Sequence, residues 1–269
     1  MVGKPYFKRD SGHGRGTWMR DALPPSDVSR RLQWNTYGSQ GRLVYQFSSE
    51  RAMIKNSTDA IYDLGQIPFE GTGHVVYRHA LYYQKSGSWK IVRYDLRHRT
   101  TTTVNFVHHR DADYHGTEKL YKGLPGAMDF AVDETGLWVI YANHKDPAGR
   151  EEMGYADWAN DDVFFLAKLD PFTLDRMKVF KLKVPMNYRG NGFMVCGTLY
   201  IVRHSDRRRT SIAWTYDAYT EKQSHPRIAF SNPYGKTAQL SYDPKTNEIL
   251  GWDSGKLVLY PLLLKDTPL

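Results

Sequence analysis

The apolar residues of this chain recur in short runs that alternate with polar residues, and turn residues separate the runs. The stretch MDFAVDETGLWVIY, residues 128–141, shows the pattern: two apolar runs flank a Glu-Thr-Gly turn. The apolar residues do not hold the 3.6-residue period of an amphipathic helix. With 19 Tyr, 11 Phe and 7 Trp, the composition favours strands as well. The pattern predicts an all-β chain.

A repeat becomes visible when four segments are aligned on a shared apolar pair. The pairs lie 56, 62 and 50 residues apart, and each follows a strand and a turn: Leu81-Tyr82, Leu137-Trp138, Leu199-Tyr200 and Ile249-Leu250. Three of the segments continue with a strand that ends in Asp, at Asp95, Asp170 and Asp217. Asp suits that place because its carboxylate can bond the backbone two residues on. A fourth strand follows, as in residues 177–182.

Four antiparallel strands that repeat at this spacing are the pattern of a β-propeller, in which each blade is one sheet. The N-terminal region adds a fifth set of runs at residues 17–19, 32–35 and 43–47. The sequence therefore predicts a five-bladed β-propeller that forms one domain over residues 1–269.

The repeat also places one carboxylate in an unusual position. Counting back eight residues from each pair gives Gly73, Asp129, Asn191 and Ser241. The first strand of each blade lines the channel of a propeller, so these positions are expected to ring one level of it. A buried charge without a partner is costly. We therefore expect Asp129 to face a small cation or water at the centre.

Charge and composition narrow the function only in part. The formal net charge of +8 favours acidic partners such as sulfated glycans or nucleic acid. Base-stacking aromatic residues on a basic strand are not evident, so nucleic acid is not expected. No apolar run approaches the length of a membrane span, and the start of the sequence, at Gly3-Lys4-Pro5, does not have the basic-then-apolar pattern expected of a signal peptide. The sequence is interpreted as an excised domain from which any targeting segment has been removed.

Five ordered motifs resemble those of the olfactomedin-domain family. They are GTWMRD from Gly16, GTGHVVY from Gly71, AVDETGLWVIY from Ala131, CGTLY from Cys196 and YDP from Tyr242. The resemblance extends from about Val2 to Leu264. It implies a five-bladed propeller in a secreted, non-enzymatic protein of the extracellular matrix or cell surface that binds other proteins. It also implies oligomerisation through an N-terminal region outside this sequence.

The resemblance implies a calcium site as well. Its ligands would be Asp129, Asn191, the carbonyls of Gly192 and Leu240, and the side chain at Ser241, where the family has a second Asp. Calcium affinity depends on the number of charged oxygens. With one carboxylate missing, we expect no tightly bound cofactor, and at most a weakly held Ca²⁺ or Na⁺ in a water-filled channel.

The single cysteine has two interpretations. Cys196 could be a small buried apolar residue, as free cysteines often are. The resemblance instead implies a disulfide from Cys196 to a cysteine just before the domain, outside this sequence.

Several other groups are candidate sites. Asn56-Ser57-Thr58 is a glycosylation triplet. Arg207, Arg208 and Arg209 could bind anions or a partner, or could be a solvated surface, as could the acidic run at 143–162. Residues 107–116, rich in His and Asp, could hold a metal but are expected to be a surface loop.

The alternative function is a propeller glycoside hydrolase or a sulfated-glycan-binding module. Glycoside cleavage normally needs two carboxylates, and the shared channel position supplies only Asp129. The sequence therefore favours a binding module over an enzyme.

Overall fold

The computed structural model describes residues 1–106, 114, 116, 119–142 and 163–263, and strands make up most of this part of the chain. The helical segments of these described residues are one α-helix, α1 (Glu50–Ile54), and two 3-10 turns, at Ser29–Arg31 and Met186–Tyr188. The prediction of an all-β chain is confirmed. Among the described residues, no helix has the length and apolar character needed to span a bilayer.

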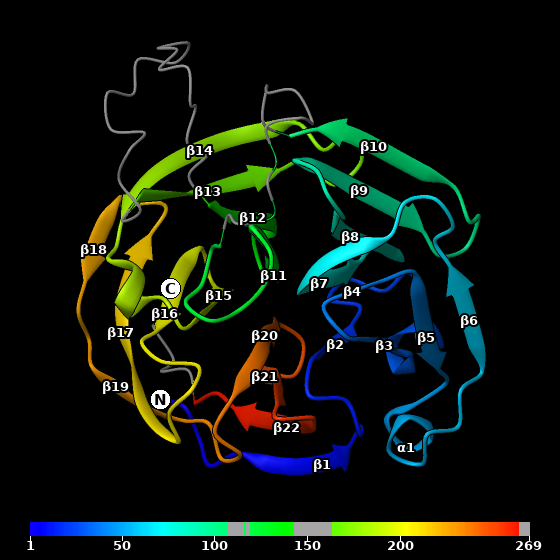
Figure 1. The fold of residues 1–269 in the computed structure, drawn as a ribbon, viewed down its shortest axis with the longest axis horizontal. Helices are drawn as coiled ribbons and strands as arrows, with labels where there is room; N and C mark the ends of the chain where they lie inside the picture. Colours follow the sequence, from blue (N-terminus) through cyan, green and yellow to red (C-terminus); the bar gives the residue numbers. More distant parts are fainter. Residues whose placement is uncertain (107–113, 115, 117–118, 143–162, 264–269) are drawn as a thin grey trace.

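Hydrogen bonds join the strands into four sheets arranged around a common centre (Figure 1). The first sheet contains β2 (Gly16–Arg20), β3 (Gln33–Tyr37), β5 (Leu43–Phe47) and β6 (Ala60–Asp63). The last contains β20 (Thr237–Asp243), β21 (Glu248–Asp253), β22 (Lys256–Pro261) and β1 (Tyr6–Asp10). A third contains β15 (Asn191–Val195), β16 (Thr198–Val202), β17 (Arg209–Asp217), β18 (Lys222–Ser224) and β19 (Ile228–Ser231).

The remaining sheet has nine strands and consists of two antiparallel halves. One half is β7 (Phe69–Tyr77), β8 (Ala80–Lys85), β9 (Lys90–Asp95) and β10 (Thr101–Asn105), with β4 (Gln40–Gly41) beside β7. The other half is β11 (Met128–Asp133), β12 (Gly136–Ala142), β13 (Val163–Leu169) and β14 (Arg176–Lys183). Among the described residues, the only strand pairing between the halves is the parallel pairing of Asp129 with Gly73.

The predicted strand ends and turns are found where the repeat placed them. The strand pair at residues 128–141 forms β11 and β12, with Glu134 and Thr135 in the turn. Asp95, Asp170 and Asp217 each accept a hydrogen bond from the backbone N–H two residues on, at 2.8–3.0 Å. Local sequence therefore sets these hairpins.

The apolar core is divided into clusters that lie between neighbouring sheets or half-sheets. Trp18 of β2, for example, packs in one cluster with Trp252 of β21, and Val75 of β7 packs in another with Val132 of β11. The innermost strands, β2, β7, β11, β15 and β20, contact one another at the centre. The first strand of each group thus supplies the residues around the axis.

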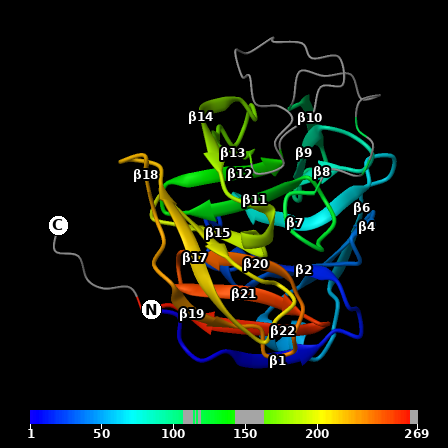
Figure 2. The same ribbon diagram turned by 60° about the vertical axis from the view of Figure 1, so that its left-hand side comes forward.

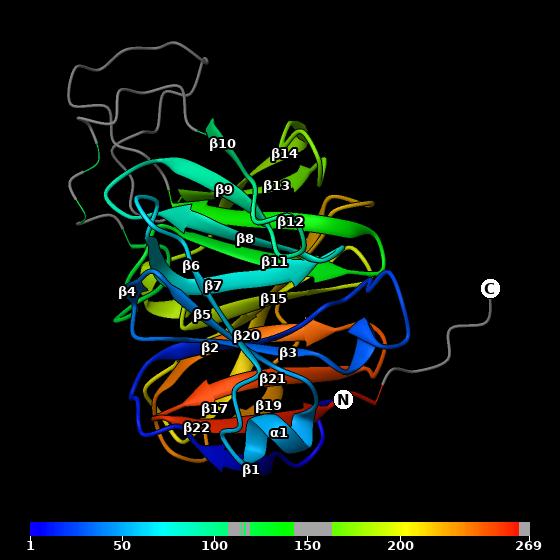
Figure 3. The same ribbon diagram turned by 90° about the vertical axis from the view of Figure 1, so that its right-hand side faces the viewer.

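The first and last described strands lie side by side in one sheet. Strand β1 pairs with β22, and the terminal amine of Met1 donates a hydrogen bond to the carbonyl of Leu263 at 2.7 Å (Figure 2). Helix α1 lies beside β1 (Figure 3), and Glu50 forms an ion pair with Lys8 at 2.7 Å. The first strand therefore belongs to the last sheet.

Candidate functional site

A small cavity of about 10 Å³ lies where the innermost strands meet, and Asp129 lines it. We call it the axial cavity; Thr72, Gly73, Tyr121, Asn191 and Gln239 are also among its lining residues. Asp129 alternates along β11 with Met128 and Phe130, whose side chains enter the apolar core. Alternation along a strand thus turns the carboxylate away from that core. The space is about enough for one water molecule.

Asp129 has a partner that its own strand does not provide. The hydroxyl of Tyr121 donates a hydrogen bond to Asp129 Oδ2 at 2.7 Å, and both groups are buried. Burial raises the pKa of Asp129 to about 7, although the hydrogen bond from Tyr121 lowers it. Burial, and then the nearby Asp129, raises the pKa of Tyr121 well above its ordinary value. The pair holds a carboxylate that carries a proton far more readily than usual.

The strands around Asp129 approach each other closely. A Cβ added at Gly73 would lie 2.3 Å from Asp129 Oδ1, and one at Gly192 would lie 2.6 Å from the Tyr121 hydroxyl. Asn191 Oδ1 accepts a hydrogen bond from the N–H of Gly192, whereas its buried Nδ2 has no partner among the described residues. The two glycines leave room for the carboxylate and the phenol.

Hydrogen bonds also connect the inner strands around the axis. The hydroxyl of Thr17 donates to the carbonyl of Thr72, and the hydroxyl of Thr72 donates to the carbonyl of Ala238, both at 2.7 Å. The side-chain amide of Gln239 meets the backbone N–H and carbonyl of Trp18 at 3.4 Å. Short polar side chains therefore join β2, β7 and β20 where they converge.

Ser241 is placed differently from the other positions selected by the repeat. Gly73, Asp129 and Asn191 line the axial cavity, but Ser241 is not among its lining residues. The turns at residues 78–79, 134–135 and 196–197, which follow the other inner strands, each have two residues. The corresponding turn between β20 and β21, at residues 244–247, has four. The longer turn shifts the count by two residues. Gln239 consequently takes the place expected for Ser241.

The other implied calcium ligands have different surroundings. Leu240 is buried in the apolar cluster that contains Phe193 and Ile249, and Gly192 lies beside the Tyr121 hydroxyl. Among the lining residues the only carboxylate is Asp129. Calcium in proteins takes about six to eight oxygens, several of them charged. The axial donor set does not fit that requirement.

Cys196 lies in the turn between β15 and β16 and is exposed, so its interpretation as a small buried residue is wrong. The turn needs left-handed backbone at both positions, with φ of +47° at Cys196 and +75° at Gly197. Such a two-residue turn matches the twist of the hairpin it joins. Although the residue is exposed, partial desolvation of its sulfur and then the nearby Glu134 raise the pKa of the Cys196 thiol to about 11. The thiol is therefore protonated at neutral pH.

The β15–β16 turn is held by the preceding hairpin. The N–H of Gly197 donates to Asp133 at 2.5 Å, and the N–H of Cys196 donates to Glu134 at 2.8 Å. Asp21 accepts in the same way from the N–H groups of Arg78 and His79. Thus Asp133 at the end of β11 and Asp21 just after β2 each bind the turn of the next hairpin along the chain.

The remaining candidate residues lie on the surface or outside the described residues. Asn56 is exposed just after α1, and Arg207, Arg208 and Arg209 are exposed at the start of β17 and in the turn before it. The acidic run at 143–162 and most of the run at 107–116 are outside the described residues.

Tyr121 and Gln239 are the axial residues that the sequence did not reveal. Tyr121 lies in the segment before β11, outside every strand pattern, and no motif connects it with Asp129. Gln239 would have been found by counting back from the end of β20 rather than from the pair after its turn.

Comparison of the sequence with known proteins identifies relatives of this chain. Myocilin from Canis lupus familiaris and myocilin from Bos taurus are each 30% identical over 251 residues, which cover 93% of this chain. The chain spans about half the length of these curated relatives, 48% in each case.

Among solved structures, the WD40 domain of Toxoplasma gondii coronin has a TM-score of 0.44 at 9% identity, covering 91% of this chain and 56% of that one. The extracellular domain of a one-component system from B. thetaiotaomicron has a TM-score of 0.41 at 12% identity, covering 87% and 27%. The olfactomedin-like domain matches residues 1–267, nearly the whole sequence. The chain therefore belongs to the olfactomedin-like domain family.

Proposed function

We propose that this chain is a secreted, extracellular protein-interaction module with no enzymatic activity. The observation that carries the proposal is the match of the olfactomedin-like domain to residues 1–267. In this proposal the exposed loops on the rigid sheets make the contacts, since recognition residues are often carried by loops. Adhesion to matrix proteins, glycosylation at Asn56 and oligomerisation through a region outside this sequence belong to the same proposal.

The proposal includes a single propeller domain of five blades. The nine-stranded sheet counts as two blades because its halves share only one parallel pairing. Five buried apolar clusters then match the five interfaces of a closed ring, since each contains residues from two neighbouring groups. An open row of five blades would have one interface fewer.

The composition and size of the axial cavity support the proposed absence of enzymatic activity. Glycoside hydrolysis normally uses two carboxylates, and Asp129 is the only one among the lining residues. Its carboxylate is engaged by Tyr121, and the cavity of about 10 Å³ has no room for a sugar ring. Asp129 is better suited to a structural role.

We further propose that the axial site is independent of calcium. The Tyr121 hydroxyl supplies the hydrogen-bond donor that Asp129 needs, and the proton that Asp129 readily holds removes the buried charge. Together they replace a cation as the means of stabilising a carboxylate in the core. A weakly held Na⁺ or a water molecule would complete the cavity.

The function is tested by displaying the purified chain as a multimer against an array of purified extracellular domains. Saturable binding to a subset of them is expected. The same protein should not hydrolyse a panel of fluorogenic glycosides. Hydrolysis that disappears in Asp129→Asn would overturn the proposal, as would the absence of binding to any extracellular domain.

Independence of calcium is tested by thermal unfolding. Millimolar calcium should change the melting temperature of the parent protein little, because a ligand stabilises as RT ln(1 + [L]/Kd) and Kd here is high. Ser241→Asp should not create calcium-dependent stability, since residue 241 is not among the residues lining the axial cavity. A shift of several degrees that chelator reverses, in either protein, would contradict the proposal.

A further inference from the structure

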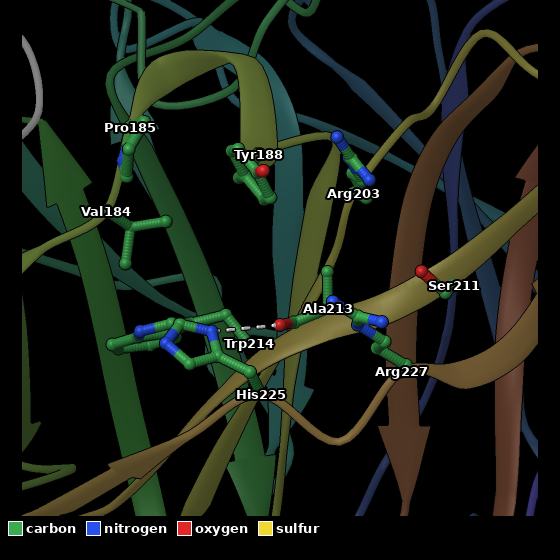
Figure 4. Close-up of a pocket in the computed structure, with 9 residues that line it drawn as sticks. All are labelled: Val184, Pro185, Tyr188, Arg203, Ser211, Ala213, Trp214, His225 and Arg227. Carbon is green, nitrogen blue, oxygen red and sulfur yellow. Dashed lines mark hydrogen bonds between the residues drawn. The ribbon is translucent and has the colours of Figure 1, made fainter.

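A second cavity, of about 640 Å³, opens beside β17 and shares no lining residue with the axial cavity (Figure 4). We call it the β17 pocket. Its volume lies in the range of ordinary ligand pockets. The lining residues are Val184, Pro185, Tyr188, Arg203, Ser211, Ala213, Trp214, His225 and Arg227.

The pocket exists because the edge of β17 changes partners. Strand β19 pairs with residues 209–212 and β18 pairs with residues 215–217, so among the described strands none pairs with Ala213 and Trp214 on that edge. Residues 225–227 connect β18 to β19 beside this gap, and the His225 ring approaches the carbonyl of Ala213 at 3.4 Å. The gap in strand pairing thus lies along the wall of the pocket.

Two arginines lie on one side of the β17 pocket (Figure 4). Arg203 stacks its guanidinium over the ring of Tyr188, 4.4 Å from the centroid. Stacking fixes the plane of the guanidinium and leaves its N–H edge to bind a carboxylate with two hydrogen bonds. Neither Arg203 nor Arg227 forms an ion pair within the described part of the chain, and no Asp or Glu is among the lining residues.

The surroundings of the pocket are also positive. His204, next to Arg203 in the chain, has a lowered pKa because of partial burial and then the charges of Arg207 and Arg203; Asp206 opposes this shift, and Lys122 adds to it. These cations would attract an anionic ligand and raise its rate of association. Among the described residues, no carboxylate lines the pocket beside the two arginines.

The opposite wall is apolar. Val184 and Pro185 face the two arginines across the pocket, and Trp214 contributes to its floor (Figure 4). A ligand that fills the pocket must therefore combine an anionic group with an apolar one. A sulfated glycan matches this poorly, because its many hydroxyls would find few partners besides the hydroxyls of Ser211 and Tyr188.

We propose that the β17 pocket binds an acidic and apolar peptide segment of a partner protein. A carboxylate of the segment pairs with Arg203 and Arg227, and a neighbouring apolar side chain packs against Val184 and Pro185. The inference rests on the proposed function as a protein-interaction module and names the chemistry of one contact that it makes.

The experiment selects binders from a library of random peptides displayed on phage, with the whole chain as bait. Selected peptides should carry Asp or Glu beside apolar residues. Measured by fluorescence polarisation, their affinity should fall about tenfold or more in Arg203→Gln/Arg227→Gln, as expected for the loss of charged hydrogen bonds. The control Arg31→Gln/Arg97→Gln removes the same charge elsewhere and should bind like the parent.

Ser211→Trp fills the pocket without changing its charge and should also abolish binding. This variant distinguishes binding inside the pocket from non-specific electrostatic attraction to the surface. Unchanged melting temperatures would show that both variants fold. Selection of no peptides, of peptides without acidic residues, or of peptides that bind all variants equally would overturn the inference. So would heparin retention that depends on Arg203 and Arg227 while no peptide binds, since that result assigns the pocket to sulfated glycans.

The extracellular-domain array separates this inference from the proposed function. Partners that bind the pocket variants as tightly as the parent would contradict the β17 pocket alone. Peptide binding without any partner on the array would contradict the proposed function alone.

Discussion

Asp129 is a carboxylate held inside the protein by one phenol, and its environment links proton binding to folding. Its pKa is about 7 in the folded protein, against an ordinary value of 3.8, so the folded state binds the proton more tightly than the unfolded chain. The stability contributed by this proton is therefore complete below about pH 4 and is lost as the pH rises through about 7. The difference amounts to on the order of 4 kcal/mol.

Asp129→Asn should remove this pH dependence. The amide keeps the shape and still accepts the hydrogen bond from Tyr121, so the variant should be more stable than the parent near neutral pH and similar to it near pH 4. Urea unfolding at a series of pH values measures the difference. Parallel stability curves for the two proteins between pH 4 and pH 8 would contradict the raised pKa of Asp129.

The same residue shows how far a sequence can predict a site. Alternation and the repeat single out Asp129, Gly73 and Asn191, because those signals are carried by the strands themselves. Tyr121 comes from an irregular segment whose path depends on tertiary packing, so no periodic signal marks it. The β17 pocket was unpredictable for a related reason, since it depends on where the edge of β17 changes partners.

At the scale of elements, β7 and β11 approach each other more closely than side chains normally permit. A Cβ at Gly73 would lie 2.3 Å from Asp129 Oδ1 and 2.6 Å from Asp129 Cα. The second contact involves backbone, so rotation of a side chain cannot relieve it. The parallel pairing of the two strands therefore requires glycine at this position.

Gly73→Ala should destabilise the protein by about 3 kcal/mol or more, because the two strands must move apart. Gly14→Ala is the matched control, since no atom lies within 4 Å of its added Cβ, and it should change stability by less than about 1 kcal/mol. Chemical denaturation of both variants measures the effect. Equal stabilities would show that β7 and β11 can separate at little cost.

The hairpins were predictable from sequence because each is set by local apolar pairs, turn residues and Asp caps. The register of the inner strands at the axis was less predictable from the sequence. The turn at residues 244–247 is two residues longer than the others. Counting back a fixed number of residues across this turn therefore selects Ser241, whereas Gln239 is the residue at the axis. The place of β1 was not predicted, since the partner of an isolated N-terminal strand is decided by the whole fold.

At the scale of the molecule, β1 covers the edge of β22 and closes the last sheet. Deleting residues 1–10 should lower the melting temperature by on the order of 10 °C and promote aggregation through the uncovered edge. The control Tyr6→Ser/Phe7→Ser keeps the strand and alters two side chains that are 56% and 54% exposed, so it should melt like the parent. Light scattering during thermal unfolding follows both effects. An intact melting temperature after deletion would mean that β1 is dispensable.

The closure of β1 on β22 also has a consequence in time. Residues 6–10 are made about 250 residues before their partners, residues 256–261, so this pairing cannot form until β22 has been synthesised. Trp18 and Phe47, which pack with Leu250 and Trp252, stay uncovered for the same period. Pairings so distant in sequence form slowly. Until β22 is made, this apolar surface stays exposed on the growing polypeptide, which is the condition in which chaperones bind incomplete domains.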